Sequence, residues 1–330
     1  MKLLVTGCFG FIGYNFLNLL QKKYDKELEI VGIDSLNFPT SRINHKNFRN
    51  INFDFYQIDI NDIDQIPVKG VDLVINFAAE SHVDNSISKP IGFIDSNVRG
   101  VGKLLYWSLK NKVDKFIHIS TDEVYGSVEQ EFPSEDKSFN PSSPYSASKA
   151  AAEHICNAFS RTYGQNIIMV RPSNNYGIYQ QPEKLIPYSI VNLISGKNIE
   201  IYGEGKNIRH WLHVSDTCRA IMTILEKSSE NEVFNIGSGD YFDNLHIAKN
   251  LIEIFNYDNS RITFVEDRLG HDFRYAVNFD KLQSIGWQPK ADFKEELEKI
   301  VYWYKNNEEW WIDSYKKTLN DRKKRNSLDQ

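Results

Sequence analysis

A hydroxyl and two adjacent carboxylates, Thr121, Asp122 and Glu123, follow directly after an apolar run that ends at Ile119. An alcohol beside a pair of acids can bind a substrate hydroxyl, donate a proton and accept one, which is general acid–base chemistry. The same residue types also cap helices and end sheet edges, so the triplet alone has a structural alternative. The other motifs of the chain decide between the two.

Tyr145 and Lys149 form a second reactive pair, in the motif "YSASK". Side chains at i and i+4 share one face of a helix, so the ammonium can lower the pKa of the phenol from about 10 and create a tyrosinate base. Tyr106 and Lys110 have the same spacing, and we assign that pair to a solvated helix face. The break "NPSSP" just before Tyr145 favours Tyr145 and Lys149 as the functional pair.

Three glycines, Gly7, Gly10 and Gly13, lie between an apolar run and a helical pattern. At this spacing they allow a tight turn in which backbone N–H groups approach a pyrophosphate at a helix N-terminus. Asp34, about 20 residues farther on, is the expected acid for the adenosine ribose and would repel a 2′-phosphate. We therefore predict that the cofactor is NAD rather than NADP.

Further residues are expected around the same cofactor. Asp59 and Ile60 follow the third apolar run and are expected near the adenine, although Asp59 equally fits a helix cap. The predicted cofactor-binding residues are Gly7, Gly10, Phe11, Ile12, Gly13, Asp34, Asp59, Ile60, Ala78, Tyr145 and Lys149.

Composition excludes several classes of protein. The chain has 330 residues, 41% of them hydrophobic, and a net charge of -5, which fits one large domain or a large and a small one. No basic stripe interleaved with aromatics points to nucleic acid. Cys8, Cys156 and Cys218 lack ligand spacing, which predicts free thiols, no metal site and a reducing compartment. No segment reads as a membrane span or a cleaved signal, so we expect a soluble cytoplasmic protein.

Seven short apolar runs alternate with stretches of helical spacing: Leu3–Val5, Glu29–Ile33, Phe53–Ile58, Leu73–Asn76, Phe116–Ile119, Ile167–Val170 and Val233–Ile236. This alternation predicts an α/β fold with a doubly wound parallel sheet of the Rossmann type. We predict an NAD-binding domain of residues 1–172 plus 215–236 and a smaller mixed α/β substrate lobe of residues 173–214 plus 237–315. Residues 316–330 are polar and are expected to form a tail that frays.

Together these motifs resemble the extended short-chain dehydrogenase/reductase superfamily and, within it, the nucleotide-sugar 4,6-dehydratases of the dTDP-glucose type. The resemblance extends from Leu3 to about Trp311 and rests on seven ordered motifs: "AAESHVD", "STDEVYG", "YSASK", "SNNYG", "PEKLIP", "IRHWLHVSD" and "GHDFRY". It implies that Tyr145 deprotonates the C4 hydroxyl, which Thr121 also binds. It further implies that Asp122 is the acid at O6 and Glu123 the base at C5, with hydride returned to C6 to give a 4-keto-6-deoxy sugar. Asp122 then needs a pKa well above about 4.

The resemblance also implies a binding site for a nucleotide sugar, made by Ser81, His82, Asn174, Glu183, Lys184, Arg209, Asn235, Arg268 and His271. Simpler alternatives are a solvated charge for Lys184, a turn residue for Asn235 and a structural histidine for His82. A homodimer is implied through a four-helix interface formed by residues 98–110 and 147–163 of each copy.

Three residues depart from the dTDP-glucose pattern: Asn85 and Phe273 stand where Arg is usual, and Leu269 where Pro is usual. Asn85 and the late "NNEEWW" look instead like UDP-glucose 4,6-dehydratases. The base, the substituent at C2 (glucose or N-acetylglucosamine) and the C5 configuration of the product therefore stay open.

Sister activities and a non-catalytic role are the rival interpretations. A UDP-sugar 4-epimerase would not need the pair Asp122 and Glu123, and a UDP-glucuronate decarboxylase has Ser in place of Asp122. A non-catalytic NAD-binding protein would be expected to lose Tyr145, Lys149 or an acid, and this chain keeps them all.

Overall fold

The computed structural model describes residues 1–24, 28–49, 52–228 and 231–328 of the chain. Its strands are β1 (Lys2–Thr6), β2 (Glu29–Ile33), β3 (Phe53–Tyr56), β4 (Leu73–Asn76), β5 (Lys115–Ile119), β6 (Ile167–Pro172), β7 (Asn174–Tyr176), β8 (Ile199–Tyr202), β9 (Ile208–His213), β10 (Val233–Ile236), β11 (Asp240–Asp243) and β12 (Ile262–Val265). Its α-helices are α1 (Phe11–Tyr24), α2 (Pro39–Asn47), α3 (Val83–Ser88), α4 (Pro90–Phe93), α5 (Val101–Lys110), α6 (Pro144–Tyr163), α7 (Leu185–Ile194), α8 (Val214–Lys227), α9 (Asn244–Ile254), α10 (Asp280–Ser284), α11 (Phe293–Asn306) and α12 (Glu308–Leu328). Shorter helical turns are η1 (Ile60–Gln65), η2 (Ile94–Gly100), η3 (Asp122–Tyr125) and η4 (Asn259–Arg261).

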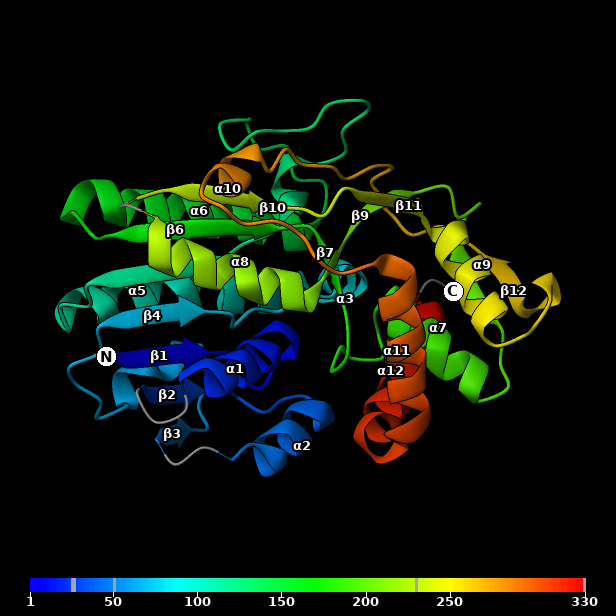
Figure 1. Ribbon diagram of the computed structural model, residues 1–330, viewed down its shortest axis with the longest axis horizontal. Coiled ribbons are helices and arrows are strands. Elements are labelled where there is room, and N and C mark those ends of the chain that lie inside the picture. Colours follow the sequence, from blue (N-terminus) through cyan, green and yellow to red (C-terminus); the bar gives the residue numbers. More distant parts are fainter. Residues whose placement is uncertain (25–27, 50–51, 229–230, 329–330) are drawn as a thin grey trace.

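A seven-stranded sheet forms the larger part of the molecule, in the order β10-β6-β5-β4-β1-β2-β3 (Figure 1). Every adjacent pair in it is parallel. The predicted α/β class with a doubly wound parallel sheet is thereby confirmed, and each of the seven predicted apolar runs is one of its strands. The strand order reverses between β1 and β4, and in open α/β sheets ligands bind outside the carboxyl ends of the strands at such a point.

Two apolar layers cover the two faces of this sheet. Leu3 and Val5 of β1 belong to the cluster that also holds α1 and α8, whereas Leu4 points to the cluster beneath α5 and α6. Because successive side chains of a strand alternate between faces, a strand covered on both sides is apolar throughout. The stretch Leu3–Val5 is therefore apolar throughout because β1 is covered on both faces of the sheet.

A smaller lobe carries a second core. It contains the three-stranded sheet β11-β9-β7 and the pair β12-β8, together with α7, α9 and α11 (Figure 1). The chain enters this lobe at β7, returns to the large sheet through α8 and β10, and then re-enters the lobe at β11. The exact domain boundaries given above stay a prediction.

The expectation that residues 316–330 fray is wrong for residues 316–328, which continue α12. Trp311 and Tyr315 are buried in the core of the lobe, and Leu319 packs against the same core. Their spacing of four residues forms one apolar stripe on a helix that is otherwise polar. Thr40 N–H donates to Ser314 Oγ, which fixes the helix to the Rossmann part of the chain. Residues 329–330 lie outside the described residues.

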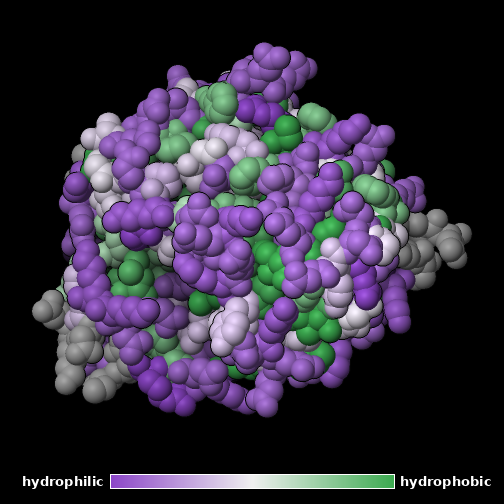
Figure 2. Space-filling view, turned by 45° about the vertical axis from the view of Figure 1, so that its right-hand side comes forward, coloured by the Kyte–Doolittle hydropathy of each residue, from purple (hydrophilic) through white to green (hydrophobic). Residues whose placement is uncertain are grey.

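Among the described residues, no helix is long and apolar enough to cross a bilayer. On the face shown in Figure 2, hydrophilic residues predominate and hydrophobic ones form separate patches. Cys8, Cys156 and Cys218 are all buried free thiols, as predicted.

Candidate active site

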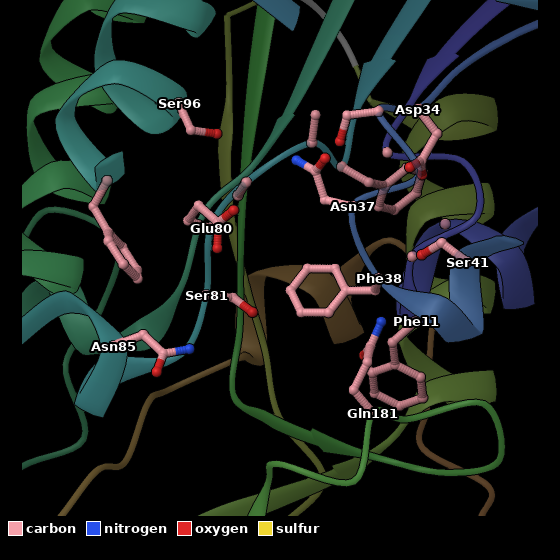
Figure 3. Close-up of a pocket in the computed structure, with 18 of the residues that line it drawn as sticks. Phe11, Asp34, Asn37, Phe38, Ser41, Glu80, Ser81, Asn85, Ser96 and Gln181 are labelled. Carbon is pink, nitrogen blue, oxygen red and sulfur yellow. The ribbon is translucent and has the colours of Figure 1, made fainter. Parts of the chain in front are cut away.

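A cavity of about 530 Å³ opens at the switch point of the sheet. In Figure 3, Phe11, Asn37, Phe38 and Gln181 lie on one side of it and Asn85 and Ser96 on the other, with Glu80 and Ser81 between them. Of the predicted site residues, the cavity is lined by Gly7, Gly10, Phe11, Ile12, Gly13, Asp34, Asp59, Ile60, Ala78, Ser81, Tyr145, Lys149, Glu183 and Lys184. The structure thus brings the glycine turn, the ribose acid and the Tyr/Lys pair to one pocket.

The turn between β1 and α1 has no room for side chains at two of its glycines. Gly7 has φ +62°, and a Cβ there would lie 2.7 Å from the backbone nitrogen of Ala78. A Cβ on Gly13 would lie 2.3 Å from Gly7 O, so α1 can pack this close to the turn only with glycine. The first turn of α1 is thereby presented to the pocket, as binding of a diphosphate requires.

Asp34 directly follows β2, is nearly buried and lines the pocket. Its carboxylate accepts hydrogen bonds from Phe9 N–H at 3.0 Å and Leu36 N–H at 2.8 Å, which fix its direction. Burial raises the pKa of Asp34, while these backbone donors oppose the rise. Asp59 accepts a hydrogen bond from Asn61 N–H at 2.8 Å, which confirms the helix cap, and it also lines the pocket, so a place near the adenine stays a prediction.

Helix α6 positions the Tyr/Lys pair. Pro144 stands in its first turn, and Ser143 and Ser146 form a reciprocal capping box that fixes the helix start next to Tyr145. Lys149 lies one turn later, and its ammonium donates to Ile119 O at the end of β5, at 2.5 Å. Burial lowers the pKa of Lys149 to about 8.

The phenol of Tyr145 does not have the low pKa that the sequence predicted. Burial and the nearby carboxylates of Glu123 and Asp122 raise the pKa of Tyr145, and a hydrogen bond with Thr121 only partly opposes them. Lys149 is held by a backbone carbonyl instead of the phenol. In the protein alone, the pKa of the Tyr145 phenol is set by burial and the neighbouring acids rather than by Lys149.

The triplet after β5 forms the start of the 3₁₀ helix η3. Thr121 is its N-cap and accepts a hydrogen bond from Glu123 N–H at 3.3 Å. Asp122 is 2% exposed and Glu123 is 9% exposed. Thr121 therefore provides the helix cap. Under the alternative, in which the carboxylates only end a sheet edge, Asp122 and Glu123 would be exposed to solvent. Burial of both acids favours the chemical interpretation of the triplet.

The two acids have different surroundings. Burial raises the pKa of Asp122 well above its usual value, and the charge of Glu123 raises it further. Burial also raises the pKa of Glu123, but the cations Arg268, Lys184 and Arg209 oppose that rise. Asp122 Oδ2 has no hydrogen-bond partner within the described residues. A proton is therefore held more readily by Asp122 than by Glu123.

Cations of the substrate lobe surround the same point. Arg209 is buried, and its guanidinium donates to the carbonyls of Asp272 and Ile208 and lies 4.4 Å from the ring centre of Tyr275. Tyr275 O–H lies within hydrogen-bond distance of both Asp272 Oδ2, at 2.6 Å, and Glu123 Oε2, at 3.4 Å. The order of the motifs gave no signal that Asp272 and Tyr275 would reach Glu123.

Two further cations reach this region from separate loops. Lys184 donates to Ser81 O at 2.5 Å, and Arg268 forms an ion pair with Asp84 at 3.3 Å. His271 pairs with Asp267, and burial lowers the pKa of His271 to about 4. Lys184, Arg268 and Arg209 form a cationic wall beside the two acids.

Asn174 and His82 differ in whether their polar side-chain atoms have hydrogen-bond partners within the described protein. Asn174 Oδ1 is a buried acceptor that has no partner in the described parts of the chain. The ring of His82 accepts a hydrogen bond from Asn85 N–H at 3.4 Å and contacts Glu183 O at 3.0 Å, as a structural histidine does.

Asn235 has its amide occupied inside the protein, and its predicted place near the nucleotide stays a prediction. Its amide accepts a hydrogen bond from Tyr125 O–H at 2.9 Å and donates to the carbonyls of Pro133 and Asn278 at 3.1 and 2.9 Å. Tyr125 also contacts Arg171. Asn235 is thus part of a fully buried network behind η3, because a buried amide needs partners for each of its polar atoms.

Several pocket residues were not predicted. Among those that line the cavity are Ser35, Asn37, Phe38, Ser41, Ala79, Glu80, Ser120, Gln180, Gln181, Ser314, Lys317, Thr318 and Asp321. Ala79 and Glu80 stand inside the recognised motif "AAESHVD", which was a usable signal. Of the residues of α12, Lys317, Thr318 and Asp321 come from the segment that was predicted to be a tail. Across the described residues, no group of His, Cys, Asp and Glu is arranged to hold a metal ion.

Comparison with known proteins agrees with this site. The family model described as GDP-mannose 4,6 dehydratase matches residues 4–300. A dTDP-glucose 4,6-dehydratase from Streptomyces niveus is 37% identical over 318 residues, covering 94% of this chain and 95% of the relative. The chain belongs to this family. The predicted resemblance to nucleotide-sugar 4,6-dehydratases is confirmed.

Solved structures of relatives share the fold. The crystal structure of the dTDP-glucose 4,6-dehydratase DesIV from Streptomyces venezuelae, with NAD and TYD bound, has a TM-score of 0.91 at 38% identity and covers 95% of this chain and 100% of its own. A UDP-glucuronic acid 4-epimerase from Bacillus cereus, with UDP-glucuronic acid and NAD bound, has a TM-score of 0.86 at 28% identity and covers 93% and 99%. The shared architecture therefore does not by itself separate a 4,6-dehydratase from a 4-epimerase.

Proposed function

We propose that this chain is an NAD-dependent 4,6-dehydratase of a nucleotide-activated hexose, dTDP-glucose or UDP-glucose, and forms the 4-keto-6-deoxy sugar with loss of water. The observation that carries the proposal is the pair Asp122 and Glu123, two adjacent buried acids with different electrostatic surroundings, beside Tyr145. Oxidation of C4 needs one base, whereas elimination across C5 and C6 needs a further base and an acid. The chain supplies one group for each task.

NAD fits the pocket on three observations: the glycine turn with no space for Cβ atoms, the fixed carboxylate of Asp34 at its edge, and Lys149 at the far end. When bound, NAD supplies the hydride acceptor for C4 and the hydride donor for C6. Tyr145 would take the proton of the C4 hydroxyl as a phenolate, which requires that the positive charges of Lys149 and the bound nicotinamide offset the raised pKa that the phenol has in the protein alone, and Thr121 would bind the same oxygen. Lys149 has a pKa of about 8, so it can carry a positive charge at neutral pH next to Tyr145.

The elimination step uses the difference between the two acids. The ketone at C4 acidifies the C5 proton, so Glu123 removes that proton while Asp122 gives its own proton to O6, which leaves as water. A raised pKa keeps Asp122 protonated, and three cations favour the ionised form of Glu123. After hydride arrives at C6, Glu123 can return its proton to C5. Tyr145 releases to solvent the proton that it took from the C4 hydroxyl, and Asp122 takes one proton from solvent, so all three groups return to their starting states.

The diphosphate of the substrate needs cations and fixed donors. Arg209, Lys184 and Arg268 form the cationic wall beside Glu123, whereas Asn174 Oδ1, a buried acceptor with no partner among the described residues, suits a sugar hydroxyl rather than a phosphate oxygen. The nucleobase is expected near Leu269 and Phe273, which are 78% and 56% exposed. Both residues depart from the dTDP-glucose pattern, so the base stays open between thymine and uracil.

A direct incubation tests this proposal. The purified protein, with no added cofactor, is mixed with dTDP-glucose, UDP-glucose or UDP-N-acetylglucosamine, and proton NMR follows the appearance of a C6 methyl signal. A methyl signal from dTDP-glucose or UDP-glucose supports the proposal and names the base. A signal from UDP-N-acetylglucosamine alone selects the alternative substrate and calls for the C5 configuration to be read from the same spectra. Silence from all three, with NAD shown to be bound, contradicts 4,6-dehydration and favours a 4-epimerase or a non-catalytic role.

We also propose that the protein is a cytoplasmic homodimer. Tyr106 of α5 and Tyr163 of α6 are 48% and 54% exposed. Lys110 lies 4.2 Å from the ring centre of Tyr106, on a helix face that a second copy can cover. A monomeric mass in light scattering at micromolar concentration would contradict the dimer.

A further inference from the structure

Helix α12 forms an outer wall of the cofactor pocket. Ser314, Lys317, Thr318 and Asp321 all line the cavity that holds the glycine turn. They lie on one face of the helix, at spacings of three, one and three residues. The family match ends at residue 300, so this wall is not part of the region that the family model describes.

The helix is anchored at two points, one on each part of the chain. Ser314 Oγ accepts a hydrogen bond from Thr40 N–H at 3.3 Å on the Rossmann side. Arg322 pairs with Glu200 Oε2 at 2.6 Å and lies 4.3 Å from the ring centre of Tyr188 in the lobe. A helix fixed to both parts of the chain holds Lys317 over the mouth between them.

The ammonium of Lys317 lies beside the segment that follows Asp34. It is 4.8 Å from the ring centre of Phe38 and donates to Asn37 O at 3.4 Å. Figure 3 shows Phe38 and Phe11, the first residue of α1, on the same side of the pocket. The N-terminus of α1, at the glycine turn, is where this fold places the diphosphate of a dinucleotide.

A second observation places the charge of Lys317 toward the middle of the pocket. Glu80 lies between the two sides of the cavity, and the charge of Lys317 lowers the pKa of Glu80 against the larger effect of burial. A dinucleotide that reaches from Asp34 to Tyr145 has its diphosphate between those ends. Lys317 therefore lies between the Asp34 end of the pocket, where its ammonium meets Asn37 and Phe38, and Glu80 in the middle.

We propose that Lys317 contacts the diphosphate of bound NAD from the solvent side, and that α12 in this way slows release of the cofactor. The inference rests on the proposed function for the identity of the cofactor. Lys317 is exposed in the protein alone, so its attraction to a diphosphate is expected to weaken as salt rises. Asp321, on the same face, carries the opposite charge and is expected to act in the opposite direction.

The test measures the rate of NAD release from the purified holoprotein, with a dehydrogenase that traps free NAD. Lys317→Gln keeps a donor for Asn37 O but removes the charge, and we expect release about threefold to tenfold faster at low salt, converging with wild type at high salt. Lys316→Gln is the matched control, because Lys316 is exposed, pairs with Asp313 and is absent from the pocket lining. Asp321→Asn is expected to slow release.

Three results would overturn the inference: wild-type release from Lys317→Gln at low salt, an equal acceleration at every salt concentration, or the same acceleration in Lys316→Gln. An equal acceleration at all salt concentrations would mean that Lys317 only tethers the helix. A wild-type protein that retains NAD but converts no nucleotide sugar would contradict the proposed function and leave this inference standing. A wild-type protein that binds no NAD would overturn both.

Discussion

Replacing Asp122 by Asn tests the division of labour between the two acids most directly. Asp122 is 2% exposed, Oδ2 has no partner among the described residues, and Oδ1 contacts Thr121 Oγ at 3.3 Å. An amide fills the same space and keeps the acceptor for Thr121, so the variant is expected to fold normally. What it loses is the proton for O6.

The expected loss follows from the role of a general acid. Such groups contribute about 10² to 10⁴ in rate, and a tenfold change is about 1.4 kcal/mol, so the barrier to elimination is expected to rise by about 3 to 5 kcal/mol. Removal of hydride from C4 does not use Asp122. Substrate mixed with the Asp122→Asn holoprotein should therefore reduce bound NAD, visible in the near-ultraviolet, while the C6 methyl signal appears slowly or not at all.

Glu123→Gln is the matched variant for the other acid. Both variants are expected to lose turnover, but only Glu123→Gln is expected to lose exchange of the C5 proton with deuterated solvent, because Glu123 is the base at C5. Turnover by Asp122→Asn within about threefold of wild type would refute the assignment of Asp122 as the acid. Retained C5 exchange in Glu123→Gln would refute the assignment of Glu123.

Three further predictions concern stability and cofactor retention. Because the pKa of Asp122 is higher in the folded than in the unfolded chain, the folded protein binds more protons between those two values, so wild-type stability falls as pH rises above about 4. The melting temperature of Asp122→Asn, measured relative to wild type, should therefore increase as pH rises above about 4, and a constant difference would contradict the raised pKa. Gly13→Ala places a methyl 2.3 Å from Gly7 O, so the purified variant should lack bound NAD; retention at the wild-type level would disprove the tight turn. Glu153→Gln leaves Arg171 without its carboxylate in a site where the two side chains are 0% and 4% exposed, and urea unfolding should show a loss of about 3 to 5 kcal/mol, whereas a loss below about 1 would show that the pair is solvated.

The seven strands and the glycine turn were predictable because their causes are local. A strand covered on both faces is apolar along its length, and Gly7 has a backbone conformation that other residues rarely adopt. The Tyr145/Lys149 pair was separated from Tyr106/Lys110 by the chain break before it. In the structure, the capping box of Ser143 is that break.

The environment of each side chain was less predictable, since it depends on segments far away in the sequence. Asn235 was expected near the nucleotide, but Tyr125 and two distant carbonyls occupy its amide. The pKa of Tyr145 was expected to fall because of Lys149, which is four residues away, but the acids after β5 raise it. A spacing shows which side chains share a helix face, but not which other elements pack against that face.

Helix α12 illustrates the same limit from the side of composition. Its basic and polar residues suggested a frayed tail, although Trp311, Tyr315 and Leu319 repeat every four residues. Three apolar positions in a polar segment stabilise a helix only where a core is available to receive them. The core of the lobe, assembled from α7, α9 and α11, provides that surface.

The geometry of η3 explains how two adjacent residues acquire different chemistry. In a 3₁₀ helix successive side chains point about 120° apart, so neighbours in sequence face different surroundings. Glu123 reaches Tyr275 and the cations of the lobe, whereas Asp122 stays next to Thr121 with one oxygen unpaired. An α-helix would also point the two side chains in different directions. The short η3 ends after Tyr125 and keeps both acids at the carboxyl end of β5. The difference in pKa is therefore created by the lobe, and substitutions at Arg268 should change the protonation of Glu123 more than that of Asp122.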